Sequence, residues 1–223
     1  MNPAQIEAFL TALQQQNIKV AQTLLSDHPE LANAQGPQGI SLLLMCAYYQ
    51  QMDLAHLIAA KKSELSLFEA TALGKQASVA AILEKEPKAL QQPAADGFYL
   101  LGFASFFGQL ELVKYFLAQG ANVNQAAQND FKVTPIHSAV AKGSYEITQC
   151  LLEHGANPNL AQAKGITALH SAAHQSRLDL VKLLVAHGAQ VDAKMEDGQT
   201  PLSMAKKENA SEVVVFLSTQ TDK

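Results

Sequence analysis

The feature that most constrains this chain is a repeat of about 33 residues that runs along nearly its whole length. Aligning each copy on its first large apolar residue gives seven units. Their first core positions are Phe9, Leu43, Leu67, Leu101, Ile136, Leu169 and Leu202. Subtracting successive numbers gives spacings of 34, 24, 34, 35, 33 and 33 residues, so one step is short. Such a period predicts an elongated stack of similar units rather than a single globular core.

Two more columns share this alignment. The position three residues later is small and reads Ala12, Cys46, Ala70, Ala104, Ala139, Ala172 and Ala205. The position fifteen residues later is large and apolar and reads Leu24, Ile58, Ile82, Phe116, Leu151, Leu184 and Leu217. A small residue beside large ones at helical spacing predicts helices that touch closely between neighbouring units.

The most regular unit begins at Thr134 and shows why each copy forms two short helices. Thr134 can cap a helix that starts at Pro135, where a proline loses no intrahelical hydrogen bond. Gly143 and Gly155 can each end a helix by adopting a left-handed conformation. Two antiparallel helices of this length cannot bury their apolar faces alone, so the unit needs copies stacked on both sides.

The six residues that open this unit, TPIHSA from Thr134 to Ala139, differ by one residue from the pattern T-P-L-H-x-A. The chain therefore resembles the ankyrin-repeat family, and its units that end in HPELAN and EPKALQ resemble bacterial members. The resemblance implies an all-α ankyrin-repeat solenoid of about seven helix-turn-helix units with short β-hairpin fingers. We expect one domain over 1–223, with repeats at about 3–34, 38–62, 63–95, 96–129, 130–162, 163–195 and 196–220.

Several units depart from the template. The short step leaves only Lys61 to Glu64 between helices, so the finger after the second unit should be missing. The finger before Thr134 carries a two-residue insertion within QAAQNDFK. The turn between the two helices of a unit also varies, and non-glycine residues there must accept a strained turn. The turn column reads Gln16, Gln50, Gly74, Gly108, Gly143, Ser176 and Asn209.

Charge and composition narrow the function classes. The formal net charge is -4 and no run of lysine or arginine exceeds a pair, which argues against binding to nucleic acid. No apolar stretch reaches the length of a membrane span, and the N-terminus lacks the features of a signal peptide. We therefore expect no membrane role and a cytoplasmic location. Cys46 and Cys150 are interpreted as buried free thiols, with a disulfide or a reactive thiol as the alternative.

The seven histidines are the main candidates for chemistry, and their positions favour structural roles. The resemblance implies that His137 and His170 hold the turn through hydrogen bonds to backbone and threonine. His170 and His174 have a spacing able to bind a metal, but no third ligand is evident. His154 and His187 should interact with the last carbonyls of their helices. We expect no catalytic residue, no cofactor and no metal, so the chain is not predicted to be an enzyme.

The resemblance implies binding through the finger tips and the exposed end of each first helix, which form a concave face. Residues at these places are aromatic or apolar early in the chain and polar later. The predicted partner-binding residues are Tyr48, Tyr49, Leu73, Phe98, Tyr99, Phe106, Phe107, Lys142 and His174. The alternative is that one ring of each aromatic pair packs against a neighbouring repeat. Tyr49 and Phe107 are the rings whose replacement should abolish capture of a partner.

The resulting hypothesis is a non-enzymatic module that binds an unidentified protein partner. The alternative is a groove that binds a small molecule or a peptide as a sensor or buffer. The last helix runs Val213 to Phe216 without a polar residue, which predicts a weak homodimer through the C-terminal helix.

Overall fold

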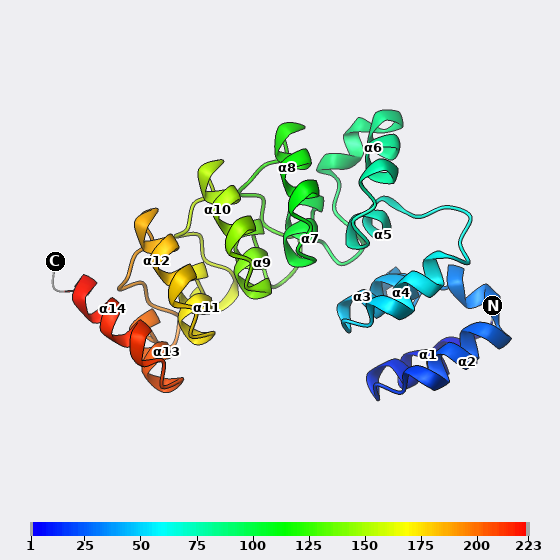
Figure 1. The fold of residues 1–223 in the computed structure, drawn as a ribbon, viewed down its shortest axis with the longest axis horizontal. Coiled ribbons are helices and arrows are strands. Elements are labelled where there is room, and N and C mark those ends of the chain that lie inside the picture. The colour runs from blue at the N-terminus through cyan, green and yellow to red at the C-terminus, as the bar shows by residue number, and fades with distance from the viewer. Residues whose placement is uncertain (1, 222–223) are drawn as a thin grey trace. The chain divides into compact units, whose positions relative to one another are not determined.

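The computed structural model describes residues 2–221, in which short helices follow one another in pairs (Figure 1). The chain divides into two compact units. Unit 1 comprises Met1–Ala89 with Ala94–Asp96, and unit 2 comprises Leu90–Pro93 with Gly97–Lys223. The single domain and its repeat boundaries stay predictions, whereas the all-α class agrees with the helices found.

Unit 1 contains three helix pairs and short 3-10 turns beside them. The pairs are α1 (Pro3–Gln14) with α2 (Ile18–Asp27), α3 (Leu42–Tyr48) with α4 (Met52–Ala59), and α5 (Leu67–Ala72) with α6 (Gln76–Lys85). The 3-10 turns are η1 (Pro29–Asn33), η2 (Pro37–Gly39) and the start of η3 (Pro87–Gln91). The prolines that replace the usual glycine stop thus open 3-10 turns, since proline suits a first turn.

Unit 2 contains four helix pairs stacked in chain order (Figure 1). The first two are α7 (Leu100–Phe106) with α8 (Leu110–Ala118) and α9 (Pro135–Lys142) with α10 (Tyr145–Glu153). The last two are α11 (Ala168–His174) with α12 (Leu178–Ala186) and α13 (Pro201–Lys207) with α14 (Ser211–Thr221). A further 3-10 turn, η4 (Ala163–Gly165), lies before α11.

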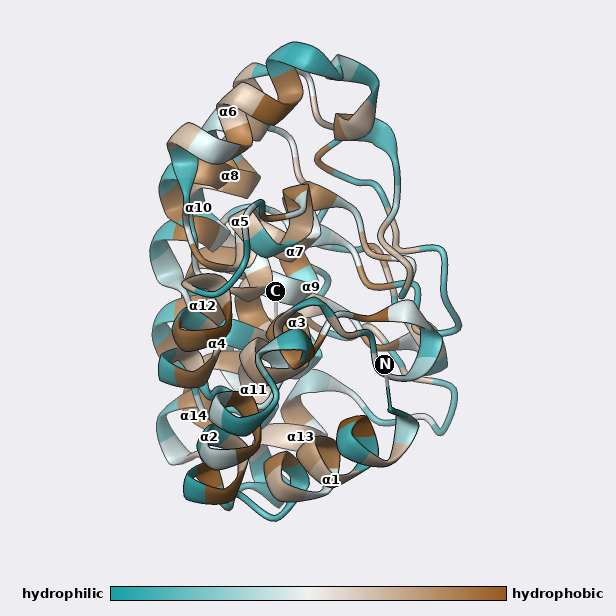
Figure 2. Cartoon of the chain, turned by 90° about the vertical axis from the view of Figure 1, so that its right-hand side faces the viewer, coloured by the Kyte–Doolittle hydropathy of each residue, from teal (hydrophilic) through white to brown (hydrophobic). Residues whose placement is uncertain are grey.

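Most members of the predicted core columns are buried, whereas Leu24 and Ile82 of the second large column are half-buried. Every member of the small column is at most 4% exposed, from Ala12 to Ala205. In the first large column Leu202 is half-buried, because it belongs to the last pair and has no following repeat to cover it. Brown and teal alternate along individual helices in Figure 2, as expected for helices that are buried on one side.

The predicted strained turn between paired helices is confirmed. All members of the turn column have a positive φ. The values are 55° at Gln16, 59° at Gln50, 66° at Gly74, 75° at Gly108, 73° at Gly143, 56° at Ser176 and 56° at Asn209. Four non-glycine side chains therefore occupy a left-handed conformation, which costs on the order of 1–2 kcal/mol each.

The connections between pairs are closed turns, and the predicted β-hairpin fingers are not confirmed. Residues 2–221 contain no named strand, only isolated bridges between Gln35 and Ser41 and between Ala161 and Thr167. A hydrogen bond from Gln162 N–H to the Ile166 carbonyl, at 2.9 Å, closes the turn before α11. The equivalent bond before Thr134 runs from Ala127 N–H to the Val133 carbonyl, which spans two more residues and agrees with the expected insertion.

The connection after α4 is short. Helix α4 ends at Ala59 and α5 begins at Leu67, with no helix or bridge between them. The expected absence of a finger here leaves space between the turns on either side of it in unit 1. Within residues 2–221, no helix is long and apolar enough to cross a membrane.

Candidate functional site

The first predicted aromatic pair lies at the end of α3 in unit 1. Tyr48 is half-buried and its hydroxyl donates a hydrogen bond to the carboxylate of Asp96. Burial, and then the Asp96 carboxylate, raise the pKa of Tyr48 above its ordinary value, so the hydroxyl stays a donor. Tyr49 ends the helix and is 40% exposed. One ring of this pair is therefore anchored and the other faces solvent.

Leu73, the other predicted residue of unit 1, does not reach the surface. It follows the last residue of α5 and is only 8% exposed. Like Tyr49, it directly follows the last residue of its helix, but the leucine packs into the unit. We assign Leu73 to the core and not to the exposed partner-binding surface.

The second aromatic pair, at the end of α7 in unit 2, also has one exposed ring, but it is the first residue of the pair and not the second. Phe107 is half-buried, with its ring centroid 4.9 Å from that of Phe103 and 5.1 Å from that of Phe106. Phe106 is 37% exposed and meets Phe107 edge to face. The exposed ring is thus Phe106, whereas the sequence favoured Phe107 as the ring to replace.

The two aromatic residues before α7 are half-buried. Tyr99 precedes the first residue of the helix, and its hydroxyl accepts a hydrogen bond of 2.7 Å from the amide of Gln128. Phe98 is its neighbour in the chain and has the same degree of burial. These residues present partial surface beside the longer turn, in which Phe131 is 66% exposed.

The two polar residues of the predicted partner-binding set lie on α9 and α11. Lys142 is exposed, and its aliphatic stem lies over Gly108, where an added Cβ would sit 3.2 Å from the lysine Cε. His174 is exposed and its Nδ1 lies 3.1 Å from a carboxylate oxygen of Glu208. In unit 2 the residues at the ends of the first helices therefore change from aromatic at α7 to polar or charged at α9, α11 and α13.

His137 and His170 have the structural role that the resemblance implies. The Nδ1 of His137 accepts from the backbone N–H of Thr134 at 3.3 Å, and its Nε2 lies 3.2 Å from the carbonyl of Ile166. His170 repeats this arrangement with Thr167 and Gln199. Burial lowers the pKa of His137 to about 4 and also lowers that of His170. Each neutral ring therefore joins a helix cap to the next turn.

The other histidine predictions can also be compared with the structure. The Nδ1 atoms of His154 and His187 lie 2.8 Å and 2.9 Å from carbonyls of their own last turns, as predicted. His170 is buried while His174 is exposed, so the two do not face one site. The described part of the chain holds no group of three metal-binding side chains. Cys46 and Cys150 are free and buried, which confirms the interpretation of both thiols.

The structure adds a site that the sequence did not single out, in the space left by the short connection after α4. The ammonium of Lys62 lies 3.0 Å from the Glu69 carboxylate, and these side chains are only 10% and 2% exposed. Glu69 also accepts from Ser66 N–H at 2.9 Å, in a capping box. The carboxylate thus occupies the helix position that histidine fills in α9. The sequence signal was SLFE in place of TPLH, next to the short step.

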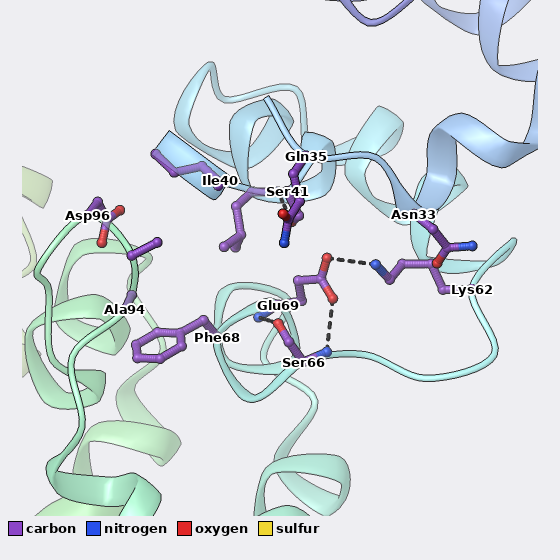
Figure 3. Close-up of a pocket in the computed structure, with 13 residues that line it drawn as sticks. Asn33, Gln35, Ile40, Ser41, Lys62, Ser66, Phe68, Glu69, Ala94 and Asp96 are labelled. Atoms are coloured by element: carbon purple, nitrogen blue, oxygen red, sulfur yellow. Dashed lines mark hydrogen bonds and ion pairs between the residues drawn. The ribbon is translucent and has the colours of Figure 1, made fainter. Parts of the chain in front are cut away.

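A cavity of about 210 Å³ opens beside this ion pair, entirely within unit 1 (Figure 3). Its lining comes from the turn before α3, from the start of α5 and from Ala94–Asp96. Ile40, Leu44 and Phe68 form apolar walls, and Asp96 adds a carboxylate held by Tyr48. In Figure 3 Phe68 and Asp96 lie on the side away from Lys62. The arrangement combines an apolar lining with fixed charges.

The repeated caps, turns and buried columns agree with comparison to known proteins. The family described as ankyrin repeats (3 copies) matches residues 67–162 and 154–223, which together make up more than half of the chain. The chain belongs to the ankyrin-repeat family. The resemblance seen in TPIHSA is thereby confirmed. Members of this family are generally protein-interaction modules and not enzymes.

Curated relatives match part of this ankyrin-repeat chain. Palmitoyltransferase ZDHHC13 of Mus musculus is 35% identical over 78 residues, which is 35% of this chain and 12% of the relative. Palmitoyltransferase ZDHHC17 of Rattus norvegicus is 34% identical over 76 residues, or 34% of this chain and 12% of the relative. The match spans about an eighth of each relative's length, through ankyrin regions, so no catalytic domain is shown for this chain.

Proposed function

We propose that this ankyrin-repeat protein is a non-enzymatic module that binds a protein partner through the exposed ends of its first helices and the turns beside them. The observation that supports this most is the shared arrangement of two aromatic pairs. In each, one ring is anchored by a neighbour while the other, Tyr49 or Phe106, is exposed by about two fifths. Exposed aromatic rings on a rigid support are where binding energy tends to concentrate.

The proposed surface has a component in each unit. In unit 1 it comprises Tyr49, with Tyr48 as its support. In unit 2 it comprises Phe98, Tyr99, Phe106 and Phe107, followed by Lys142 and His174. We expect the aromatic residues to supply most of the affinity and the exposed charges to supply selectivity, because solvated charges contribute little net binding energy.

We also propose that the helix pairs act as seven repeats, with turns in place of full β-hairpin fingers. The matching left-handed turn in every pair supports this count. These turns present side chains such as Phe131 without a long unpaired strand edge, which disfavours edge-to-edge association of strands.

A small-molecule groove is the alternative, and the sizes of the hollows argue for a protein partner. The cavity beside Lys62 and Glu69 holds about 210 Å³, below the roughly 300–1,000 Å³ of typical small-molecule pockets. Two larger hollows, of about 490 and 620 Å³, are lined by exposed and half-buried residues along helix surfaces. Neither encloses a ligand in the way that such pockets do.

Affinity capture from cells of the native host tests the proposal. Wild-type chain should retain a protein that Tyr49→Ser and Phe106→Ser each lose, while both variants keep wild-type helical content. Val20→Ser is the matched control, because Val20 is also apolar and 44% exposed but lies on the second helix of its pair. Equal recovery by all variants would place the binding surface elsewhere.

A weak homodimer through α14 is a separate part of this proposal. Val215 is 66% exposed, and it borders a groove with Leu178, Phe216, Lys182 and Glu212. A patch with an apolar centre and one charge of each sign suits a symmetric pairing. Light scattering at increasing concentration should show dimers of the wild-type chain and none of Val215→Ser. A wild-type chain that stays monomeric throughout would contradict the homodimer.

We also propose a cytoplasmic location, where thiols such as Cys46 and Cys150 stay reduced.

A further inference from the structure

We propose that the homodimer is held in one register by two symmetric ion pairs, in which Lys182 of each copy binds Glu212 of the other. This inference rests on the homodimer part of the proposed function and adds the residues by which the chain recognises its second copy. Both side chains line the groove of about 490 Å³ between α12 and α14, which lies entirely within unit 2.

The outer face of α14 departs from the corresponding face of the earlier helices in unit 2. The position two residues before the large apolar column reads Lys114 on α8, Gln149 on α10, Lys182 on α12 and Val215 on α14. Val215 is therefore apolar at a place where the other helices are polar, and it is 66% exposed. It lies beside the half-buried Leu178 and Phe216. An exposed apolar patch with a polar rim is typical of an interaction site.

The same departure leaves an acid without the base that accompanies it on α8. Three residues earlier, these helices carry Glu111, Glu146, Asp179 and Glu212. On α8 the carboxylate of Glu111 pairs with the ammonium of Lys114 at 2.9 Å, one turn away. On α14 Val215 occupies the place of that lysine, and among residues 2–221 no basic side chain forms an ion pair with Glu212. Glu212 is exposed, so a cation of another chain can reach it.

Lys182 is the matching base. It is exposed, and the acid before it on α12, Asp179, already pairs with Arg177 at 2.7 Å. The ammonium of Lys182 lies 5.9 Å from the centroid of the Phe216 ring, which favours a position over the groove. The groove thus carries a cation from α12 and an anion from α14 that do not pair with each other within the chain.

Two-fold symmetry turns these two groups into two equal contacts, because every contact of such an interface occurs twice with the roles exchanged. Helices α12 and α14 are the second helices of successive pairs and lie side by side. Lys182 and Val215 hold equal places on them, and Glu212 lies one turn before Val215. An axis through the groove lays α12 of one copy antiparallel on α14 of the other, which brings Lys182 opposite Glu212 and Val215 onto Leu178. Charges at a rim select partner and register more than they add affinity, which suits a weak dimer.

Exchanging the charges in the full chain tests the inference. Glu212→Lys and Lys182→Glu should each weaken self-association about tenfold or more, because symmetry places two like-charge contacts in every dimer. Analytical ultracentrifugation over a concentration series measures this. An equimolar mixture of the two variants should associate about as strongly as the wild-type chain, since both contacts of a mixed dimer again join a lysine to a glutamate.

Glu111→Lys is the matched control, because Glu111 holds the equivalent place on α8 and does not line the groove. It should self-associate like the wild-type chain. Circular dichroism should show wild-type helical content for all three variants. Recovery of association by mixing would show in addition that neither charge exchange has unfolded α14.

The outcomes separate this inference from the proposed function. If both charge variants dimerised like the wild-type chain while Val215→Ser did not, the homodimer would stand on its apolar contact and the ion pairs would be wrong. Weakened variants that mixing does not restore would also overturn the ion pairs. A wild-type chain that stays monomeric would contradict the ion pairs and the homodimer together. Partner capture by Tyr49 and Phe106 is measured separately and decides the rest of the proposed function.

Discussion

The start of the first helix of a repeat is held by different side chains in two parts of the molecule. The compared parts are the repeats around α9 and α11 in unit 2 and the repeat around α5 in unit 1. In unit 2 a buried neutral histidine accepts from the helix cap and reaches the carbonyl of the following turn. In unit 1 Glu69 accepts from its cap in the same way, but its other oxygen binds Lys62 from the preceding connection. The side chain at the third helix position therefore bonds to the following turn in unit 2 and to the preceding connection in unit 1.

This difference shows where binding can arise in a repeat protein. The histidine arrangement joins successive turns through buried hydrogen bonds, so we expect the regular repeats to serve mainly as a scaffold. The ion pair replaces a missing finger and leaves an open space with fixed charge beside it. Departures from the repeat pattern, more than the pattern itself, are the places that can recognise a partner.

The largest expected effect comes from breaking the buried ion pair. Lys62→Met should lower the free energy of unfolding by roughly 3–5 kcal/mol, because it leaves the carboxylate of Glu69 buried without its cation. Urea unfolding followed by circular dichroism measures this, and hydrogen exchange should show the loss at amides of unit 1. Adding Glu69→Gln should recover most of the loss, since the glutamine oxygen can still cap through Ser66 N–H.

Lys61→Met is the control for this pair of variants, because Lys61 is its exposed neighbour. A loss with Lys62→Met no larger than with Lys61→Met would mean that the ion pair does not hold the short connection, and the contrast with the histidine repeats would be lost.

A pH effect of intermediate size should distinguish the histidine repeats. The pKa of His137 is about 4 in the folded protein and 6.5 in the reference state, so the unfolded chain takes up its proton first as the pH falls. The stabilisation is therefore full above pH 6.5 and is lost between 6.5 and 4, by roughly 3 kcal/mol for this group. His137→Gln should flatten part of the pH dependence of unfolding, with the rest due to His170.

His154→Gln provides the comparison, because His154 is exposed at a helix end. It should leave in place the pH dependence that is due to burial of the His137 ring. If both substitutions flattened the profile equally, or neither did, burial of the His137 ring would not be the cause.

The smallest expected effects come from exchanging the turn residues of the two regions. Gln50 in unit 1 and Gly143 in unit 2 adopt φ values of 59° and 73°. Gln50→Gly should raise the free energy of unfolding by up to about 1 kcal/mol, and Gly143→Gln should lower it by about 1–2 kcal/mol. Thermal unfolding of each variant checks this; a stabilising Gly143→Gln would contradict the shared left-handed turn.

Much of this architecture could be predicted from local sequence. The small column, the turn column and the roles of His137 and His154 depend on neighbours within one repeat, which residue type and spacing reveal. The predicted β-hairpin fingers came from the resemblance, and the isolated bridges and turn hydrogen bonds of the structure do not confirm them. The longer turn before Thr134 was correctly expected because an insertion is visible in residue counts.

The candidate site was less predictable. Adjacent residues at a helix end point in different directions, so the pattern could not tell that Phe106 and not Phe107 is exposed. Leu73 shares a column with Tyr49 but is buried, so the column alone does not determine exposure. Lys62, Glu69 and Asp96 meet only through folding, across 34 residues of chain. The sequence could show that a finger was missing but not which side chains line the space.

Site-specific photo-crosslinking tests the central claim most directly. The photoreactive residue p-benzoylphenylalanine would replace Tyr49, Phe106 or, as a control, Val20 in the full chain, and each variant would be irradiated in an extract of the native host. The account predicts a crosslinked protein at positions 49 and 106 and none at position 20. Crosslinks at position 20, with none at 49 or 106, would contradict it.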